Sequence, residues 1–248
     1  MMGGRATMAS WVAAAFAVAW AALLPGRVEA ADPRLERWNR ELGEAVEQIR
    51  AGSPEKAIRK IDRLLAEFVD VAGPGEENAK DIGTMLVYRA VAKQAAGRPQ
   101  DAEWDWDLAS NFRSDIEALN LKPFGEAGQA LLDYAAEWIH PAERGYELDA
   151  RCAVEDCWPI TPPKAIKKPK PMFTRGARHF KVKGDLVVQV VIDAEGRPRH
   201  PRVVTELPAP SLSFTALETL REWRFEPAMV GGRPVSVPFT LTIHYDPR

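Results

Sequence analysis

Hydrophobic residues in the first half of the chain recur at spacings of three and four, the period of an amphipathic helix. The pattern predicts one helical hairpin over residues 33–68, a second over 82–112, and a further helix from about Glu126 to His140. Ser53-Pro54 supports the first hairpin, because it places a capping residue before a proline at the first helical position. The sequence therefore predicts an all-α region over residues 31–147.

The last third changes to strict alternation of apolar and polar residues, the period of a β-strand. Three strands are expected, and they lie over 186–192, 203–207 and 235–245. A short helix is expected over 175–180, and a longer one begins at Ser211 or Ser213. The chain is therefore predicted to be α+β, with an αββαβ module over residues 172–248 whose three-stranded sheet is antiparallel.

Residues 148–171 separate the two regions and are rich in proline and lysine, a composition typical of a semi-rigid linker. This segment contains the only two cysteines, Cys152 and Cys157. In an oxidising compartment we expect them to form a disulfide. Two alternatives are weaker: the spacing is not the Cys-x-x-Cys of a redox motif, and a metal site would need more ligands.

The first thirty residues have the pattern of an export signal. Arg5 supplies a positive charge, Met8 to Leu24 is an uncharged apolar run, and Val28-Glu29-Ala30 offers small residues to a signal peptidase. We therefore expect residues 1–30 to be removed and a periplasmic protein to begin at Ala31. The alternative is an uncleaved anchor in the inner membrane, although seventeen helical residues reach only about 25 Å of the roughly 30 Å hydrocarbon core.

The formal net charge of -2 conceals an acidic first part and a basic part after residue 150. The basic excess is too small, and lies too much in the linker, to indicate a nucleic-acid binder. The four histidines are scattered without a catalytic or metal-binding motif, so we expect no enzyme, no cofactor and no metal site. Four acids between Asp101 and Asp107 scatter around a helix axis, which favours a solvated face.

The second predicted hairpin resembles a tetratricopeptide repeat at its small and aromatic positions. Gly97 lies in the turn, followed by Ala102, Trp106 and Ala109. The two hairpins are offset by 45 residues where that family repeats at 34, and Lys93 stands where the motif prefers an aromatic residue. An irregular helical-hairpin domain, whose tryptophans and alanines form the core, is the alternative.

The C-terminal module carries an ordered series of short motifs over about 75 residues. They are Pro171 with Phe173, Ala177, Gly184, Asp193 with Gly196, Val203-Val204, Ala216, Trp223-Arg-Phe225-Glu-Pro227-Ala228, and Gly231-Gly232. In this order they resemble the C-terminal domain of the TonB family. Thr174 departs from the pattern, because the family usually has proline there.

The resemblance implies a small mixed α/β module that binds a short segment of an outer-membrane receptor. In that family, force from the inner-membrane proton gradient is passed on through motor proteins. Members that pull have a membrane helix with a histidine and a long proline-rich spacer, whereas Met8 to Leu24 has no histidine and the linker is short. A soluble periplasmic adaptor without energy coupling is therefore the alternative, and both an anchor and a homodimer stay open.

Pro238 indicates where a partner would bind. Backbone groups of successive strand residues point to opposite sides, and proline is tolerated where its missing N–H faces no partner strand. A regular strand then directs the backbone groups of Thr240, Thr242 and His244 to a free edge that can accept an extended peptide. Arg233 and the basic linker would favour an acidic and apolar peptide. The alternative is an edge that is solvated or covered by the linker.

Overall fold

The computed structural model describes residues 33–116, 119–137 and 160–246. The predicted export signal, both cysteines and the end of the helix expected to reach His140 lie outside these residues. Across the described ranges, none of the helices combines the length and the apolar character that crossing a membrane requires.

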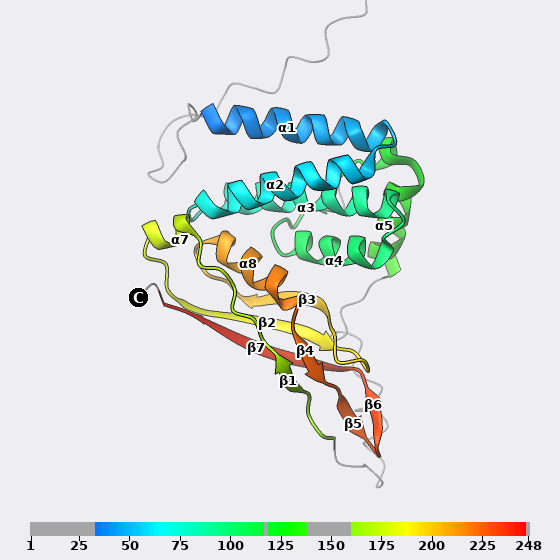
Figure 1. Cartoon of the computed structure of the whole chain (residues 1–248), viewed down its shortest axis with the longest axis vertical. Helices are drawn as coiled ribbons and strands as arrows, with labels where there is room; N and C mark the ends of the chain where they lie inside the picture. The colour runs from blue at the N-terminus through cyan, green and yellow to red at the C-terminus, as the bar shows by residue number, and fades with distance from the viewer. Residues whose placement is uncertain (1–32, 117–118, 138–159, 247–248) are drawn as a thin grey trace, which may run out of the picture.

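The N-terminal region is helical, as the hydrophobic pattern predicts. Its elements are α1 (Pro33–Arg50), α2 (Pro54–Val71), α3 (Glu76–Ala95), α4 (Pro99–Ser110), the 3-10 helix η2 (Lys122–Phe124) and α5 (Gly125–Glu137). Helices α1 and α2 form one hairpin and α3 and α4 the other, stacked in layers in Figure 1. Trp38 of α1 packs edge-on against Phe68 of α2, with ring centroids 5.1 Å apart. The two predicted hairpins are thus confirmed.

The C-terminal module contains the predicted three-stranded antiparallel sheet. Its elements are β1 (Lys164–Lys167), α7 (Arg175–His179), β2 (Gly184–Ile192), β3 (Pro198–Thr205), α8 (Pro210–Leu220), β4 (Arg224–Glu226), β5 (Ala228–Val230), β6 (Arg233–Val235) and β7 (Val237–Tyr245). The sheet order is β3-β2-β7, so β2 is central. The pairing of β2 with β7 runs without a bulge from Gly184 opposite Tyr245 to Ile192 opposite Val237.

Two small pairings were not predicted. Strand β1 lies inside residues 148–171, which were interpreted as a linker, and pairs with β4 in antiparallel orientation. Thr161 and Met229 extend this contact, because the N–H of each donates to the carbonyl of the other. Residues 160–167 therefore pack along the C-terminal module and are not a separate linker. Strands β5 and β6 form a hairpin whose two turn residues, Gly231 and Gly232, have φ of 57° and 77°. Both values are in the left-handed region that favours glycine.

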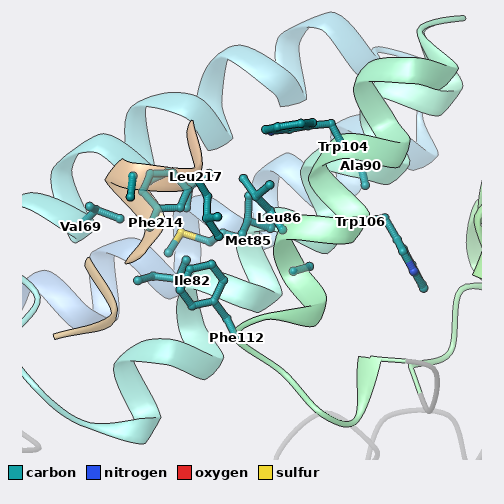
Figure 2. Close-up of a cluster of buried hydrophobic side chains, with 14 of the residues drawn as sticks. Val69, Ile82, Met85, Leu86, Ala90, Trp104, Trp106, Phe112, Phe214 and Leu217 are labelled. Carbon is teal, nitrogen blue, oxygen red and sulfur yellow. The ribbon is translucent and has the colours of Figure 1, made fainter. Parts of the chain in front are cut away.

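The helical region and the module share one hydrophobic core. In Figure 1, α7 and α8 lie between the sheet and the helices α2 and α3, and α4 lies beside α8 over β3. Figure 2 shows Phe214 and Leu217 of α8 among side chains of the helical region. Phe112 is one of these, with its ring centroid 6.4 Å from that of Phe214. Burying this apolar area stabilises the two regions as one packed unit.

Gly176 marks the closest approach between the two regions. A Cβ added there would lie 2.7 Å from the carbonyl oxygen of Val71 and closer still to that of Ala72. We predict that Gly176→Ala lowers the free energy of unfolding by about 1–3 kcal/mol, since neither backbone oxygen can move aside cheaply. Urea unfolding measures this.

The matched control is Gly43→Ala in α1, where an added Cβ meets nothing within 4 Å. This variant should gain about 0.5–1 kcal/mol, because alanine is the better helix former. Equal unfolding midpoints for the two variants would contradict the close packing of α7 on α2.

Candidate functional site

The outer edge of β7 is the candidate binding site. Pro238 lies opposite Val191 of β2, and proline cannot donate to that ladder. Pairs alternate between hydrogen-bonded and non-bonded along an antiparallel ladder, so the even-numbered residues of β7 direct their backbone groups away from β2. Those residues are Thr240, Thr242 and His244, and no other strand among the described residues pairs with them.

The side chains of β7 divide by the same parity. Those of Leu241, Ile243 and Tyr245 are buried on the helix side, whereas those of Thr240, Thr242 and His244 are exposed. An extended peptide paired with this edge would therefore meet apolar side chains on one face and polar ones on the other.

Contacts at both ends hold β7 in place. The Tyr245 hydroxyl donates to the Leu212 carbonyl at 3.0 Å, and burial raises the pKa of Tyr245 to about 12. At the other end, Phe239 packs edge-on against Phe225 with centroids 5.9 Å apart. His244 Nδ1 lies 2.6 Å from a carboxylate oxygen of Asp185 on β2. The edge is thus fixed before a partner arrives, which lowers the entropic cost of binding.

The opposite edge of the sheet, on β3, is covered by the helical region. The Asn111 side chain at the end of α4 donates to the Pro201 carbonyl at 3.0 Å and accepts from the Val203 N–H at 2.7 Å. It thus takes the place of a neighbouring strand at these two residues. This contact leaves β7 as the accessible edge of the three-stranded sheet.

A polar network beside Asn111 strengthens the same junction. His200 of β3 has a φ of 50°, and its Nδ1 lies 3.0 Å from a carboxylate oxygen of Asp107. The Tyr134 hydroxyl of α5 donates to the other oxygen of Asp107 at 2.9 Å. Burial, followed by the charge of Asp107, raises the pKa of Tyr134, so its hydroxyl keeps the proton that it donates. The network joins α4, α5 and β3.

The interpretation of the acids at 101–107 as a solvated face was wrong for two of them. Asp105 is fully buried and Asp107 is 8% exposed. Asp105 accepts two hydrogen bonds of 2.8 Å from Arg89 and lies 2.6 Å from Lys93 Nζ. A helical period cannot show this, because it places a residue around its own axis and says nothing about what covers that side.

Arg89 also reaches the C-terminal module, where Glu218 of α8 accepts from it. Burial lowers the pKa of Arg89, but the charges of Asp105 and Glu218 outweigh this effect and raise it above its ordinary value. For Lys93, burial is the largest influence and the pKa is lowered despite the attraction of Asp105. The sequence signal for this cluster was the presence of Arg89 and Lys93 in the apolar second half of α3.

Arg233, predicted as part of the edge site, lies on β6 in the hairpin before β7, where it is exposed opposite Val230. The hairpin precedes the Val237 end of β7, whereas His244 lies at the other end of the strand. The structure therefore does not bring Arg233 together with His244. The remaining predicted edge residues share one outward-facing edge.

The family-motif residues have structural positions. Asp193 accepts from the N–H of Glu195 and of Arg197, and the carbonyl of Gly196 accepts from the Phe225 N–H at 2.9 Å. Trp223 is buried and its indole N–H donates to the Pro169 carbonyl at 3.0 Å. Gly184 and Gly232 have positive φ values of 138° and 77°, and Pro227 lies between β4 and β5.

Comparison with known proteins finds relatives of the C-terminal module. Residues 169–247 match the family model described as "Gram-negative bacterial TonB protein C-terminal". The C-terminal module resembles this family. Among similar curated proteins, Protein TonB of Yersinia enterocolitica is 31% identical over 81 residues, covering 33% of this chain and 32% of the relative. Protein TonB of Klebsiella aerogenes is 28% identical over 80 residues, covering 32% of this chain and 33% of the relative.

These matches span only about a third of each TonB relative, and the family model begins at residue 169, after the helical region. The solution structure of the Pseudomonas aeruginosa TonB C-terminal domain is 22% identical, with a TM-score of 0.31. That alignment covers 38% of this chain and 90% of the other.

The covering of β3 generates a prediction. Asn111→Ala should cost about 1–2 kcal/mol of stability, since it removes two hydrogen bonds to β3. Amide exchange at Val203 should become faster, because its N–H loses the acceptor in Asn111.

Asn120→Ala is the matched control, because Asn120 accepts from the Lys122 N–H and touches no strand. Exchange at Val203 should be unchanged in this variant. If Val203 were equally protected in Asn111→Ala, the β3 edge would not be covered by this side chain.

Proposed function

We propose that this chain is a TonB-type protein of the bacterial envelope that binds an extended segment of a partner protein along the outer edge of β7. The observation that supports this is the contrast between the two sheet edges. The Asn111 side chain hydrogen-bonds the Pro201 carbonyl and the Val203 N–H of β3. The outward backbone groups of β7 have no partner strand among the described residues. An added strand would pair with these groups, and its side chains would contribute selectivity.

The resemblance to TonB suggests segments of outer-membrane receptors as partners. Arg233, exposed in the hairpin that precedes β7, would favour acidic side chains at that end of the peptide. No chemical step is required of the protein in this function, which is binding alone.

A second function, an adaptor without energy coupling, is supported by the shared core of the two regions. Because α8 packs against α2 and α3, a partner bound to β7 would be joined rigidly to a helical region that offers its own surface. Transduction needs in addition an attachment to the inner membrane and contact with motor proteins. The two functions therefore predict different N-termini: transduction predicts one anchored in the inner membrane, whereas the adaptor function predicts one released by signal cleavage.

The edge proposal predicts that Thr242→Pro abolishes peptide binding. The substitution removes an outward N–H and places a ring where the added strand would lie. The fold should persist, because that N–H points away from β2. We expect affinity to fall at least about tenfold in a calorimetric titration with peptides covering periplasmic segments of outer-membrane receptors.

Thr242→Val is the matched control, because valine is also β-branched but keeps the N–H, and its affinity should stay close to that of the unaltered chain. Circular dichroism verifies that both variants are folded. Unchanged affinity of a folded Thr242→Pro variant would exclude this edge as the binding site.

Determining where the chain begins in an envelope fraction would distinguish energy transduction from the adaptor function. A cleaved signal should give a periplasmic chain that begins at Ala31, and N-terminal sequencing measures this directly. A chain that begins at Met1 and fractionates with the inner membrane would instead favour energy transduction.

A further inference from the structure

Residues 160–184 form a basic segment that the proposed function does not require. They contain eight lysines and arginines and no aspartate or glutamate. The cations are Lys164, Lys167, Lys168, Lys170, Arg175, Arg178, Lys181 and Lys183. The segment includes β1 and α7, and in Figure 1 it runs from the lower end of the module to α7 beside the helical region.

The same segment exposes apolar side chains. Among the described residues, the large hydrophobic side chains that are exposed are Ile160, Ile166, Met172, Phe180 and Val204. Four of these five lie in the basic segment. Ile166 is 66% exposed, Met172 55% and Phe180 53%, and they stand six and eight residues apart along the segment.

Contacts with the module fix the position of these side chains. The carbonyl of Pro169 accepts from Trp223 and that of Met172 accepts from Thr215 at 2.9 Å. Phe173 packs edge-on against Tyr245, with centroids 5.9 Å apart. The backbone of the basic segment is therefore held against the module between Pro169 and Phe173, and the segment is not a free tether.

Few of its charges are neutralised. Arg175 pairs with Asp70 at 2.5 Å, and Lys167 lies 3.8 Å from Glu222 with both side chains exposed. Lys168 and Arg178 lie over the rings of Trp223 and Phe173. No ion pair within the described part of the chain involves the four other lysines, which are Lys164, Lys170, Lys181 and Lys183.

We propose that the basic segment binds the surface of a membrane that contains anionic phospholipids. Clusters of four to eight lysines and arginines are attracted to such surfaces, and separate apolar side chains can enter the headgroup region between them. A protein partner fits less well, because lysine is depleted at protein interfaces relative to the rest of the surface. Membrane binding would hold the module at a lipid surface in addition to any partner on β7.

The test is co-sedimentation of the full chain with vesicles of phosphatidylglycerol and phosphatidylcholine, or of phosphatidylcholine alone. The variant Lys164→Gln, Lys170→Gln, Lys181→Gln and Lys183→Gln should bind the anionic vesicles at least about 100-fold more weakly. Binding to neutral vesicles should not change. The apolar run Met8 to Leu24 is the same in every chain compared, so it cannot produce the difference.

The matched control is Lys56→Gln, Arg59→Gln, Arg63→Gln and Lys80→Gln, which removes the same charge from α2 and α3. It should retain binding to anionic vesicles. Ile166→Ser with Met172→Ser should weaken the binding that persists at high salt, because that part depends on apolar contact.

Equal losses in the two quadruple variants would overturn the proposal, since net charge alone would then explain binding. It would also be overturned if the chain bound poly-glutamate but bound anionic and neutral vesicles equally, which would indicate an acidic protein as the partner. Thr242→Pro should still bind anionic vesicles, so failure of the β7 site and failure of this proposal can be told apart.

Discussion

The joint between the helical region and the C-terminal module depends on Arg89. Its guanidinium is buried between Asp105 of α4 and Glu218 of α8, and a buried charge without partners would cost several kcal/mol. Buried ion pairs add little net stability over apolar packing, but they restrict which arrangements are acceptable. Arg89 also pairs with Asp62 of α2, so all its partners are satisfied only when α2, α3, α4 and α8 meet in this register. The apolar contacts around Phe214 supply the stabilisation, and Arg89 selects the arrangement.

This arrangement determines which surfaces of the module remain accessible. With α8 under α3, the end of α4 is carried to β3, where Asn111 and Asp107 meet the strand. The helix face of the sheet and the β3 edge are therefore both occupied within the chain. What remains is the β7 edge, the exposed face of the sheet and the basic segment. The helical region thus limits where the module can bind partners.

The sequence could predict the elements whose hydrophobic residues repeat at the spacing of a helix or a strand. Helical spacing predicted both hairpins, and alternation predicted β2 and β7. The turn at 193–196 predicted the return strand, which was expected over 203–207 and is β3 (Pro198–Thr205). Pro238 indicated that the even-numbered residues of β7 direct their backbone groups away from β2, because proline has no N–H to donate to a neighbouring strand. Strand β1 could not be found this way, since Lys164–Lys167 has no alternation and its partner β4 lies about sixty residues further on. Asp105 appeared solvent-facing for the same reason: its partner Arg89 is on another helix. The cover that Asn111 provides requires a contact 92 residues away along the chain.

The shared core also determines how a load on β7 would be transmitted. A peptide paired with its outer edge would pull along the strand, and nine consecutive residue pairs join β7 to β2. Such a pull is parallel to the strands, so it is spread over the whole ladder instead of opening one pair at a time. From Tyr245 the load reaches α8 through the Leu212 carbonyl, and from Glu218 of α8 it reaches Arg89 in the helical region. The described structure thus forms one connected path from β7 to α3. A transducer and a rigid adaptor both need such a path, and they differ in what holds the N-terminal end of the helical region.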